Sequence, residues 1–148
     1  MKQKYILSLS DSCATIDNVG GKGMSLAKLA AAGLAVPDGF HLTTEAYRTF
    51  VAANGLQSEI NAILAVLDTD QTAALLNASK IINKLFLSAI IPDDIEKEIC
   101  GAYTALSEST LANSNAGICV AVRSSATAED RPDASFAGQQ ETYLNISG

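Results

Sequence analysis

The sequence predicts an α+β domain in which a small mixed sheet packs with several helices. Short apolar runs typical of strands occur near both ends of the chain, at residues 4–9, 39–43, 118–122 and 139–146. Between them, from Leu56 to about Ser109, apolar residues recur at helical spacing. The 148 residues, 48% of them apolar, fit a single domain with a buried core.

The first part of the chain predicts a strand, a loop and a helix. Residues 4–9 form the strand, and the glycine-rich segment 17–23 forms the loop. Apolar residues then recur at helical spacing from Met24. Gly33 is placed to end this helix in a left-handed conformation, and Pro37 prevents the helix from resuming.

The rest of the chain predicts four helices between strands. A strand at residues 39–43 precedes the first of these helices, which ends before Gly55. Three further helices follow, and the last begins near Pro92. The unbroken apolar run 118–122 is typical of a strand covered on both faces, so we expect it at the centre of the sheet. A final strand covers residues 139–146.

Composition excludes some classes of function. A net charge of −6 with few, scattered basic residues argues against a nucleic-acid surface. No apolar run is long enough to span a bilayer, and the apolar stretch from Tyr5 is broken at Ser8, too early for a signal peptide. We therefore expect a cytoplasmic protein without membrane contact. The three cysteines, which have no CxxC spacing, are expected to be reduced, buried thiols: Cys13, Cys100 and Cys119.

Lys22 is the first candidate binding residue, because three glycines surround it in the segment DNVGGKG. Backbone N–H groups of a glycine loop in front of a helix can hold an anion, and the lysine would add a positive charge. The P-loop pattern fails, since Gly23 follows the lysine where Ser or Thr is required. Taken alone, the segment is more typical of a tight turn with an exposed lysine.

Arg123 is the second candidate, because it directly follows the apolar run 118–122. A long cation at the end of a strand stands where ligands bind in open α/β sheets. The small residues 124–127 leave room for a ligand rich in oxygen acceptors. The structural alternative is an ion pair between the arginine and nearby acidic residues, Glu129, Asp130 and Asp133.

Gly138 and Thr142 complete the candidate site, because the period of a strand places them on one face. Glycine weakens a strand unless a backbone or ligand must approach closely. The alternative is a β-bulge with a hydrogen-bonded threonine. A cation and a phosphate about 4 Å apart interact by about 4 kcal/mol at an effective dielectric near 20. Two cations that both contact a polyphosphate would therefore dominate its recognition.

Two long segments together resemble the N-terminal nucleotide-binding region of the phosphoenolpyruvate synthase and pyruvate phosphate dikinase family, which includes rifampicin phosphotransferases. They are VGGKGMSLAKLAAAGLAVPDGFHLTTEAY at residues 19–47 and AVRSSATAEDRPDASFAGQQETYLN at residues 121–145. Both are long, and they stand in the family's order. The middle helices add nothing specific to the resemblance.

The resemblance implies an ATP-grasp fold, in which ATP lies between two α+β lobes, with this chain as the first lobe. It implies that Lys22 and Arg123 bind the ATP phosphates, that Gly138 belongs to the loop that closes over them, and that Thr142 adds a hydroxyl contact. Family members use ATP and Mg²⁺ to phosphorylate a histidine on a separate domain, which passes the phosphoryl group to pyruvate or another acceptor.

Departures from the family pattern limit the expected activity. The family's nucleotide-binding region is longer than this chain, and its acidic metal ligands are expected in the second lobe, beyond residue 148. The only histidine, His41, lacks the context of a phosphocarrier and is expected to be structural. We expect residues 1–148 to form one domain, a partial ATP-grasp region without the second lobe, the phosphohistidine domain and the acceptor domain, and too short for catalysis alone.

Two alternatives to an ATP-binding fragment of a phosphotransferase stay open. One is a non-catalytic nucleotide-binding or regulatory module that contacts a partner protein. The other is purely structural, with the glycines as turns. A face prepared for a second lobe would also be apolar, so we expect self-association through the face near the strand that ends at Ile146.

Overall fold

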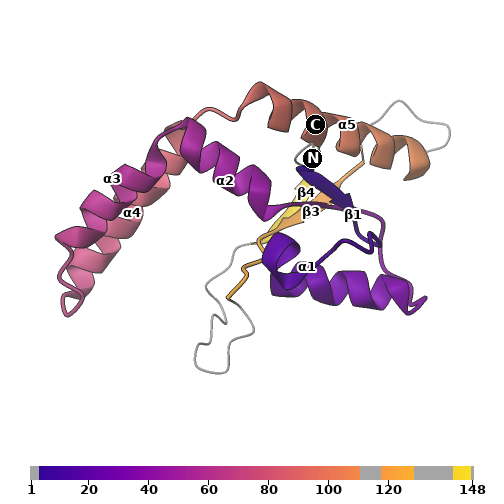
Figure 1. Ribbon diagram of the computed structural model, residues 1–148, viewed down its shortest axis with the longest axis horizontal. Coiled ribbons are helices and arrows are strands. Elements are labelled where there is room, and N and C mark those ends of the chain that lie inside the picture. Colours follow the sequence, from indigo (N-terminus) through magenta and orange to yellow (C-terminus); the bar gives the residue numbers. More distant parts are fainter. Residues whose placement is uncertain (1–3, 111–117, 129–141, 148) are drawn as a thin grey trace. The chain divides into compact units, whose positions relative to one another are not determined.

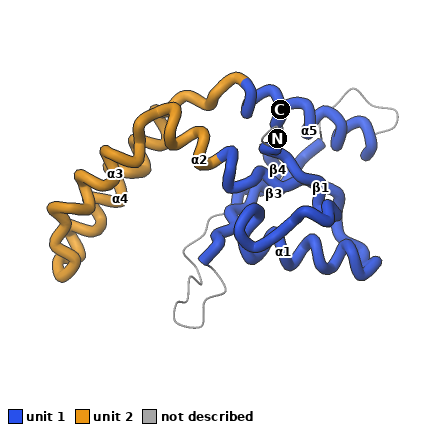
Figure 2. The backbone as a smooth tube through the Cα atoms, in the orientation of Figure 1, with its two compact units in different colours: residues 1–46, 94–148 blue, residues 47–93 orange. Residues whose placement is uncertain are grey.

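The computed structural model describes residues 4–110, 118–128 and 142–147. Within these ranges the chain forms five helices and two antiparallel sheets of two strands each (Figure 1), which confirms the predicted α+β class. The chain divides into two compact units (Figure 2). Unit 1 comprises residues 1–46 and 94–148, and unit 2 comprises residues 47–93.

The first sheet of unit 1 pairs β1 (Ile6–Ser8) with β2 (Phe40–Leu42), in agreement with the predicted strands. Ile6 lies opposite Leu42, and Ser8 lies opposite Phe40. Thr43 extends the contact, because its backbone N–H donates to the Tyr5 carbonyl at 2.8 Å. This antiparallel strand pair joins the start of the chain to the segment that follows the first helix.

Helix α1 (Ile16–Ala31) begins earlier than predicted and is kinked at Gly20. The prediction of a loop at residues 17–23 is therefore wrong, although the helix is interrupted inside that segment. Gly20 has φ 71° and ψ 177°, so the helix is interrupted there and continues from Gly21. Gly33 has φ +72° just beyond the helix, which confirms the predicted left-handed end.

The core of unit 1 forms where α1 meets β1. Leu7, Ala14, Val19 and Ala27 make one buried cluster, and Met24 packs against it. Helix α5 (Asp93–Thr110) is joined to other parts of the unit by two tyrosines. The hydroxyl of Tyr5 donates to Asp94, and the hydroxyl of Tyr103 donates to the Ile118 carbonyl.

The second sheet of unit 1 pairs β3 (Val120–Arg123) with β4 (Thr142–Ile146). The expectation of a central strand covered on both faces is wrong, because β3 has one described partner strand and most of its residues are exposed. On this pair Val122 is 49% exposed and Leu144 is 65% exposed. The sheet therefore presents apolar side chains to solvent.

The cysteines are free thiols, as predicted, but the expectation that they are buried is wrong. Cys13, Cys100 and Cys119 are all exposed. They precede α1, lie within α5 and precede β3 respectively. None of the three side chains therefore contributes to the core of unit 1.

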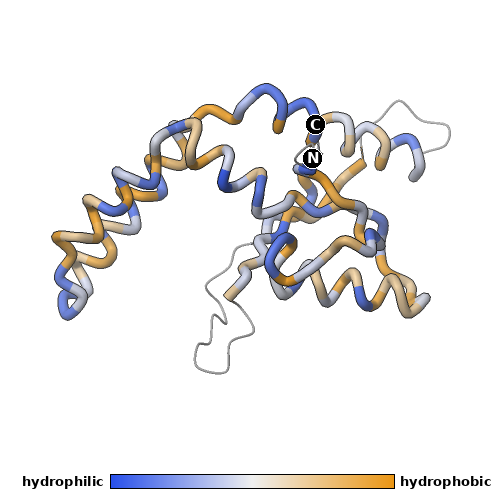
Figure 3. Tube along the Cα trace, viewed as in Figure 1, coloured by the Kyte–Doolittle hydropathy of each residue, from blue (hydrophilic) through white to orange (hydrophobic). Residues whose placement is uncertain are grey.

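Unit 2 is helical and contains most of α2 (Thr44–Ala53) together with α3 (Leu56–Ala65) and α4 (Thr72–Ser88). Hydrophobic and hydrophilic residues alternate along α3 and α4 (Figure 3), which is typical of helices with one packed face. Helix α4 contacts both neighbours: it packs against α3, and its Phe86 ring stacks with Phe50 of α2 at a centroid distance of 6.0 Å. In the described ranges no single helix is long and apolar enough to cross a bilayer, and only α4 and α5 taken together satisfy that length and composition.

Candidate functional site

The two segments predicted to carry ligand contacts lie against each other in unit 1. The backbone N–H of Gly21 donates to the Ala126 carbonyl at 3.0 Å. The backbone N–H of Gly23 donates to the Ser125 hydroxyl at 3.0 Å. These bonds join the turn that contains Lys22 to the residues that follow Arg123, and the bond between Gly23 and Ser125 spans a sequence separation of 102 residues.

Gly20 makes this approach possible because it has no side chain. A Cβ at this position would lie 2.4 Å from Ser125 Oγ and 2.7 Å from the Ser125 carbonyl carbon and oxygen. The backbone of Gly20 is also in the left-handed region, with φ +71°. Both the conformation and the contact therefore require glycine.

The glycine segment does not form the free anion cradle that the sequence suggested. Two of its N–H groups, those of Gly21 and Gly23, already donate to Ala126 and Ser125. The glycines serve close contact between two parts of the backbone. Ser125 is the residue that the sequence reasoning missed, and its only signal was its place among the small residues after Arg123.

Arg123 and Thr142 are neighbours, as cross-strand partners at the end of the β3–β4 pair. Directly opposed residues of an antiparallel pair project from the same face, so the structure brings these two predicted site residues together. Both are exposed. Lys22 is half-buried on α1, between the two N–H groups that are bonded to residues 125 and 126. Gly138 lies outside the described residues.

His41 lies beneath the glycine segment and not among the exposed candidates. A Cβ on Gly23 would meet Val19 Cβ at 2.9 Å and His41 Nδ1 at 3.3 Å, so the imidazole fills the space under the helix. The side chain is 8% exposed, and its burial lowers the pKa of the imidazole below the usual 6.5. This position fits the structural role expected for His41.

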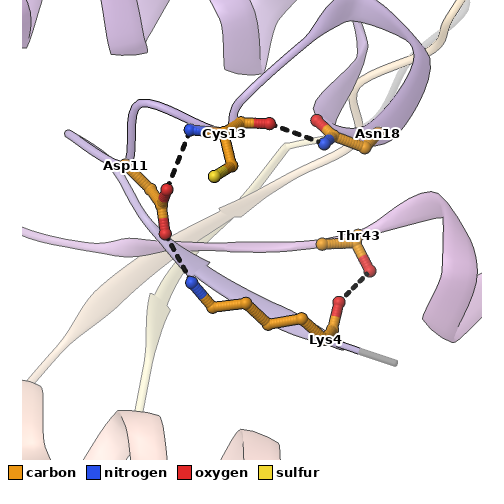
Figure 4. A network of polar contacts seen from close by, with 5 residues as sticks. All are labelled: Lys4, Asp11, Cys13, Asn18 and Thr43. Atoms are coloured by element: carbon orange, nitrogen blue, oxygen red, sulfur yellow. Dashed lines mark hydrogen bonds and ion pairs between the residues drawn. The ribbon is translucent and has the colours of Figure 1, made fainter. Parts of the chain in front are cut away.

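A polar network fixes the loop in front of α1 (Figure 4). Lys4 forms an ion pair with Asp11, whose carboxylate also accepts the Cys13 N–H at 2.9 Å. The Asn18 amide donates to the Cys13 carbonyl, and its oxygen accepts the Thr15 N–H. The hydrogen bond from Lys4 lowers the pKa of Asp11. The sequence reasoning did not anticipate this network, although an aspartate two residues before an N–H donor is a recognisable turn signal.

A groove of about 470 Å³ lies elsewhere in unit 1. It is lined by β1, β2, the segment before β2 and the second half of α5. Lys22, Arg123 and Thr142 do not line this groove. The candidate site is therefore the junction of the two segments and not this groove.

The family model for the "Pyruvate phosphate dikinase, AMP/ATP-binding domain" matches residues 16–148, which include the junction and the β3–β4 pair. This chain belongs to that family. The match confirms the resemblance seen in the sequence, and it covers all four predicted site residues.

Curated relatives of this dikinase-family chain extend the agreement to its first residues. A probable phosphoenolpyruvate synthase of Methanocaldococcus jannaschii is 49% identical over 98% of this chain. The phosphoenolpyruvate synthases of Pseudomonas aeruginosa and Neisseria meningitidis are 46% and 44% identical over 98% and 100% of it. The chain spans only 12%, 18% and 19% of these three relatives, so it corresponds to a fragment of proteins of their size.

The described residues of this dikinase-family chain do not form a metal site. Within residues 4–110, 118–128 and 142–147, no group of three or more His, Cys, Asp or Glu side chains could hold a metal ion. Mg²⁺ prefers carboxylate and phosphate oxygens, which the described part of the candidate site does not assemble. No step at this site is therefore assigned to a metal held by these residues.

Proposed function

We propose that this chain binds the phosphates of ATP with Lys22 and Arg123, as the first lobe of an ATP-grasp nucleotide-binding domain. In this proposal Thr142 adds a hydroxyl contact, and Gly138 belongs to the loop over the phosphates. The observation that carries the proposal is the junction of Gly21 and Gly23 with residues 125 and 126. This junction holds the segment that contains Lys22 against the segment that follows Arg123, in a chain that belongs to an AMP/ATP-binding family.

The chemistry of the two cations suits a polyphosphate. Arg123 presents a planar guanidinium that can bind two phosphate oxygens at once, while Lys22 acts as a compact point charge. Thr142, opposite Arg123 in the strand pair, can donate its hydroxyl to the same ligand. In a protein with a net charge of −6, these local cations are what would attract a negatively charged ligand to this site.

We propose that the whole protein is a phosphoenolpyruvate synthase-like phosphotransferase. ATP would phosphorylate a carrier histidine, which would pass the phosphoryl group to pyruvate or a related acceptor. The names and lengths of the relatives support this. Mg²⁺ would neutralise phosphate charge, and we expect its ligands outside this chain. This fragment would then bind ATP without turnover, in the cytoplasm.

Isothermal titration calorimetry with ATP tests the binding proposal. We expect Lys22→Ala and Arg123→Ala each to weaken ATP binding by about tenfold or more, because each removes a charge-assisted contact to phosphate. The matched control is Lys80→Ala, which removes an exposed lysine from α4. ATP affinity that is the same in the parent chain, K22A and R123A would contradict the proposal.

A further inference from the structure

We propose that Ser125 is a positioning residue that caps the second part of α1 from the end of β3 and so holds Lys22 in register with Arg123. This inference rests on the proposed function, because it concerns the same two cations. It adds a residue whose hydroxyl contacts the protein backbone. It follows from three features of the junction.

The first feature is the position of Ser125 relative to the restarted helix. After the kink, Gly20 stands at the N-cap, Gly21 is the first helical residue and Gly23 is the third. An N-cap Ser, Thr, Asp or Asn normally accepts a hydrogen bond from the N–H of the second or third residue. Here the Ser125 hydroxyl accepts the Gly23 N–H at 3.0 Å, so a residue 102 positions away supplies the cap.

The second feature is that a local cap is sterically excluded. A Cβ on Gly20 would lie 2.4 Å from Ser125 Oγ, so the hydroxyl occupies the space where an N-cap side chain would begin. The Ala126 carbonyl accepts the N–H of Gly21 at 3.0 Å and completes the arrangement. A glycine at position 20 and a hydroxyl at position 125 are therefore complementary.

The third feature is the place of Lys22 between the two anchored groups. Lys22 has an anchored neighbour on each side. Gly21 donates to Ala126, three positions after Arg123, and Gly23 donates to Ser125, two positions after it. These bonds fix the backbone around Lys22 relative to the backbone that follows Arg123. Loss of the hydroxyl would leave the Gly23 N–H without its cap and release this turn of α1.

The first measurement needs no nucleotide. Amide hydrogen exchange by NMR compares the 148-residue chain with Ser125→Ala, with Ser125→Thr, which keeps the hydroxyl, and with Thr127→Ala, which removes an exposed hydroxyl from the same loop. We expect S125A to speed exchange at Gly23 by about fivefold, the usual effect of losing an N-cap. S125T and T127A should leave it near the parent rate. Unchanged exchange in S125A, or an equal rise at Ala27 further along α1, would overturn the inference.

The second measurement is ATP affinity, by calorimetry well below the melting temperatures of the proteins compared. S125A should bind ATP several-fold more weakly, S125T should recover most of the loss, and the Lys80→Ala control should match the parent. If K22A and R123A weaken binding while S125A does not, the positioning role is wrong and the proposed function stands. If the parent does not bind ATP, the proposed function fails, and so does the role of Ser125 in holding Lys22 for a nucleotide. The exchange rates at Gly23 then test only whether Ser125 caps α1.

Discussion

His41 is a buried imidazole that packs under the glycine segment of α1. Its Nε2 has no hydrogen-bond partner among the described residues, and burial lowers the pKa of the side chain. The folded state therefore disfavours the imidazolium, whereas the unfolded state takes up a proton near the ordinary pKa of 6.5. The protein is consequently sensitive to acid at a position close to the candidate site.

We expect the free energy of unfolding to decrease as the pH falls below about 6.5 towards pH 5, because the unfolded chain then binds a proton that the folded chain excludes. Above this range both states are neutral at His41, and its contribution to the pH dependence disappears. Urea unfolding of the parent and of His41→Gln at several pH values measures the effect. A slope that is the same in both proteins would contradict it.

At the residue scale, the charged candidates were predictable, whereas the serine that bonds to the glycine segment was not. Lys22 and Arg123 stood out because they are isolated cations in segments of small residues. Ser125 has no such signal, since its role depends on a hydrogen bond to a glycine that is distant in the sequence. The assignment of these two cations and of Thr142 to ATP phosphates stays a prediction.

At the scale of the element, the kink of α1 depends on the contact of one glycine. Gly20 and Gly33 both have a positive φ, +71° and +72°, and Gly20 has ψ 177°. A Cβ would be 2.4 Å from Ser125 Oγ at Gly20, whereas nothing lies within 4 Å at Gly33. Both positions therefore disfavour a side chain through their positive φ, and only Gly20 adds a steric overlap.

We expect Gly33→Ala to destabilise the chain by about 1–2 kcal/mol, the cost of a left-handed alanine. Gly20→Ala should cost about 1–3 kcal/mol more, because the new methyl group overlaps the backbone of Ser125 and cannot be relieved by rotating one side chain. Chemical denaturation of both variants measures the difference. Equal losses would show that the close approach at Gly20 contributes nothing to stability.

The elements themselves were predictable where local signals decide them. The strands near Ile6 and Phe40 and the left-handed end of α1 at Gly33 agree with the sequence pattern. The glycines of segment 17–23 disfavour a helix and so predict a loop, but contact with Ser125 and Ala126 stabilises a kinked helix there. The apolar run 118–122 predicts a central strand, but its composition does not report what covers it, and the strand is exposed.

At the scale of the whole molecule, the β3–β4 pair leaves apolar side chains without cover. Val122, Tyr143 and Leu144 are 49%, 56% and 65% exposed, and each strand has one described neighbour in the sheet. An isolated two-stranded pair is marginal in water, and its free edges can pair with another chain. These features support the expected self-association. The single domain predicted for residues 1–148 also stays a prediction.

We expect the chain to form dimers or larger species as its concentration rises, and Leu144→Lys to weaken this association because it places a charge on the exposed pair. The matched control is Leu87→Lys, since Leu87 of α4 is 87% exposed. Sedimentation velocity over a range of concentrations measures the effect. A strictly monomeric parent at the highest concentration would refute the proposal.

The bond between Gly23 and Ser125 also has a consequence for how this protein matures. Its two partners are 102 residues apart, and the entropy of closing a loop of that size costs about 4 kcal/mol beyond a constant term. On a ribosome, the turn that contains Lys22 emerges long before the residues that cap it. The helices of unit 2 can fold locally in the interval, whereas the junction can form only after Ser125 has left the exit tunnel. Competence to hold a nucleotide should therefore arise only after Ser125 has emerged.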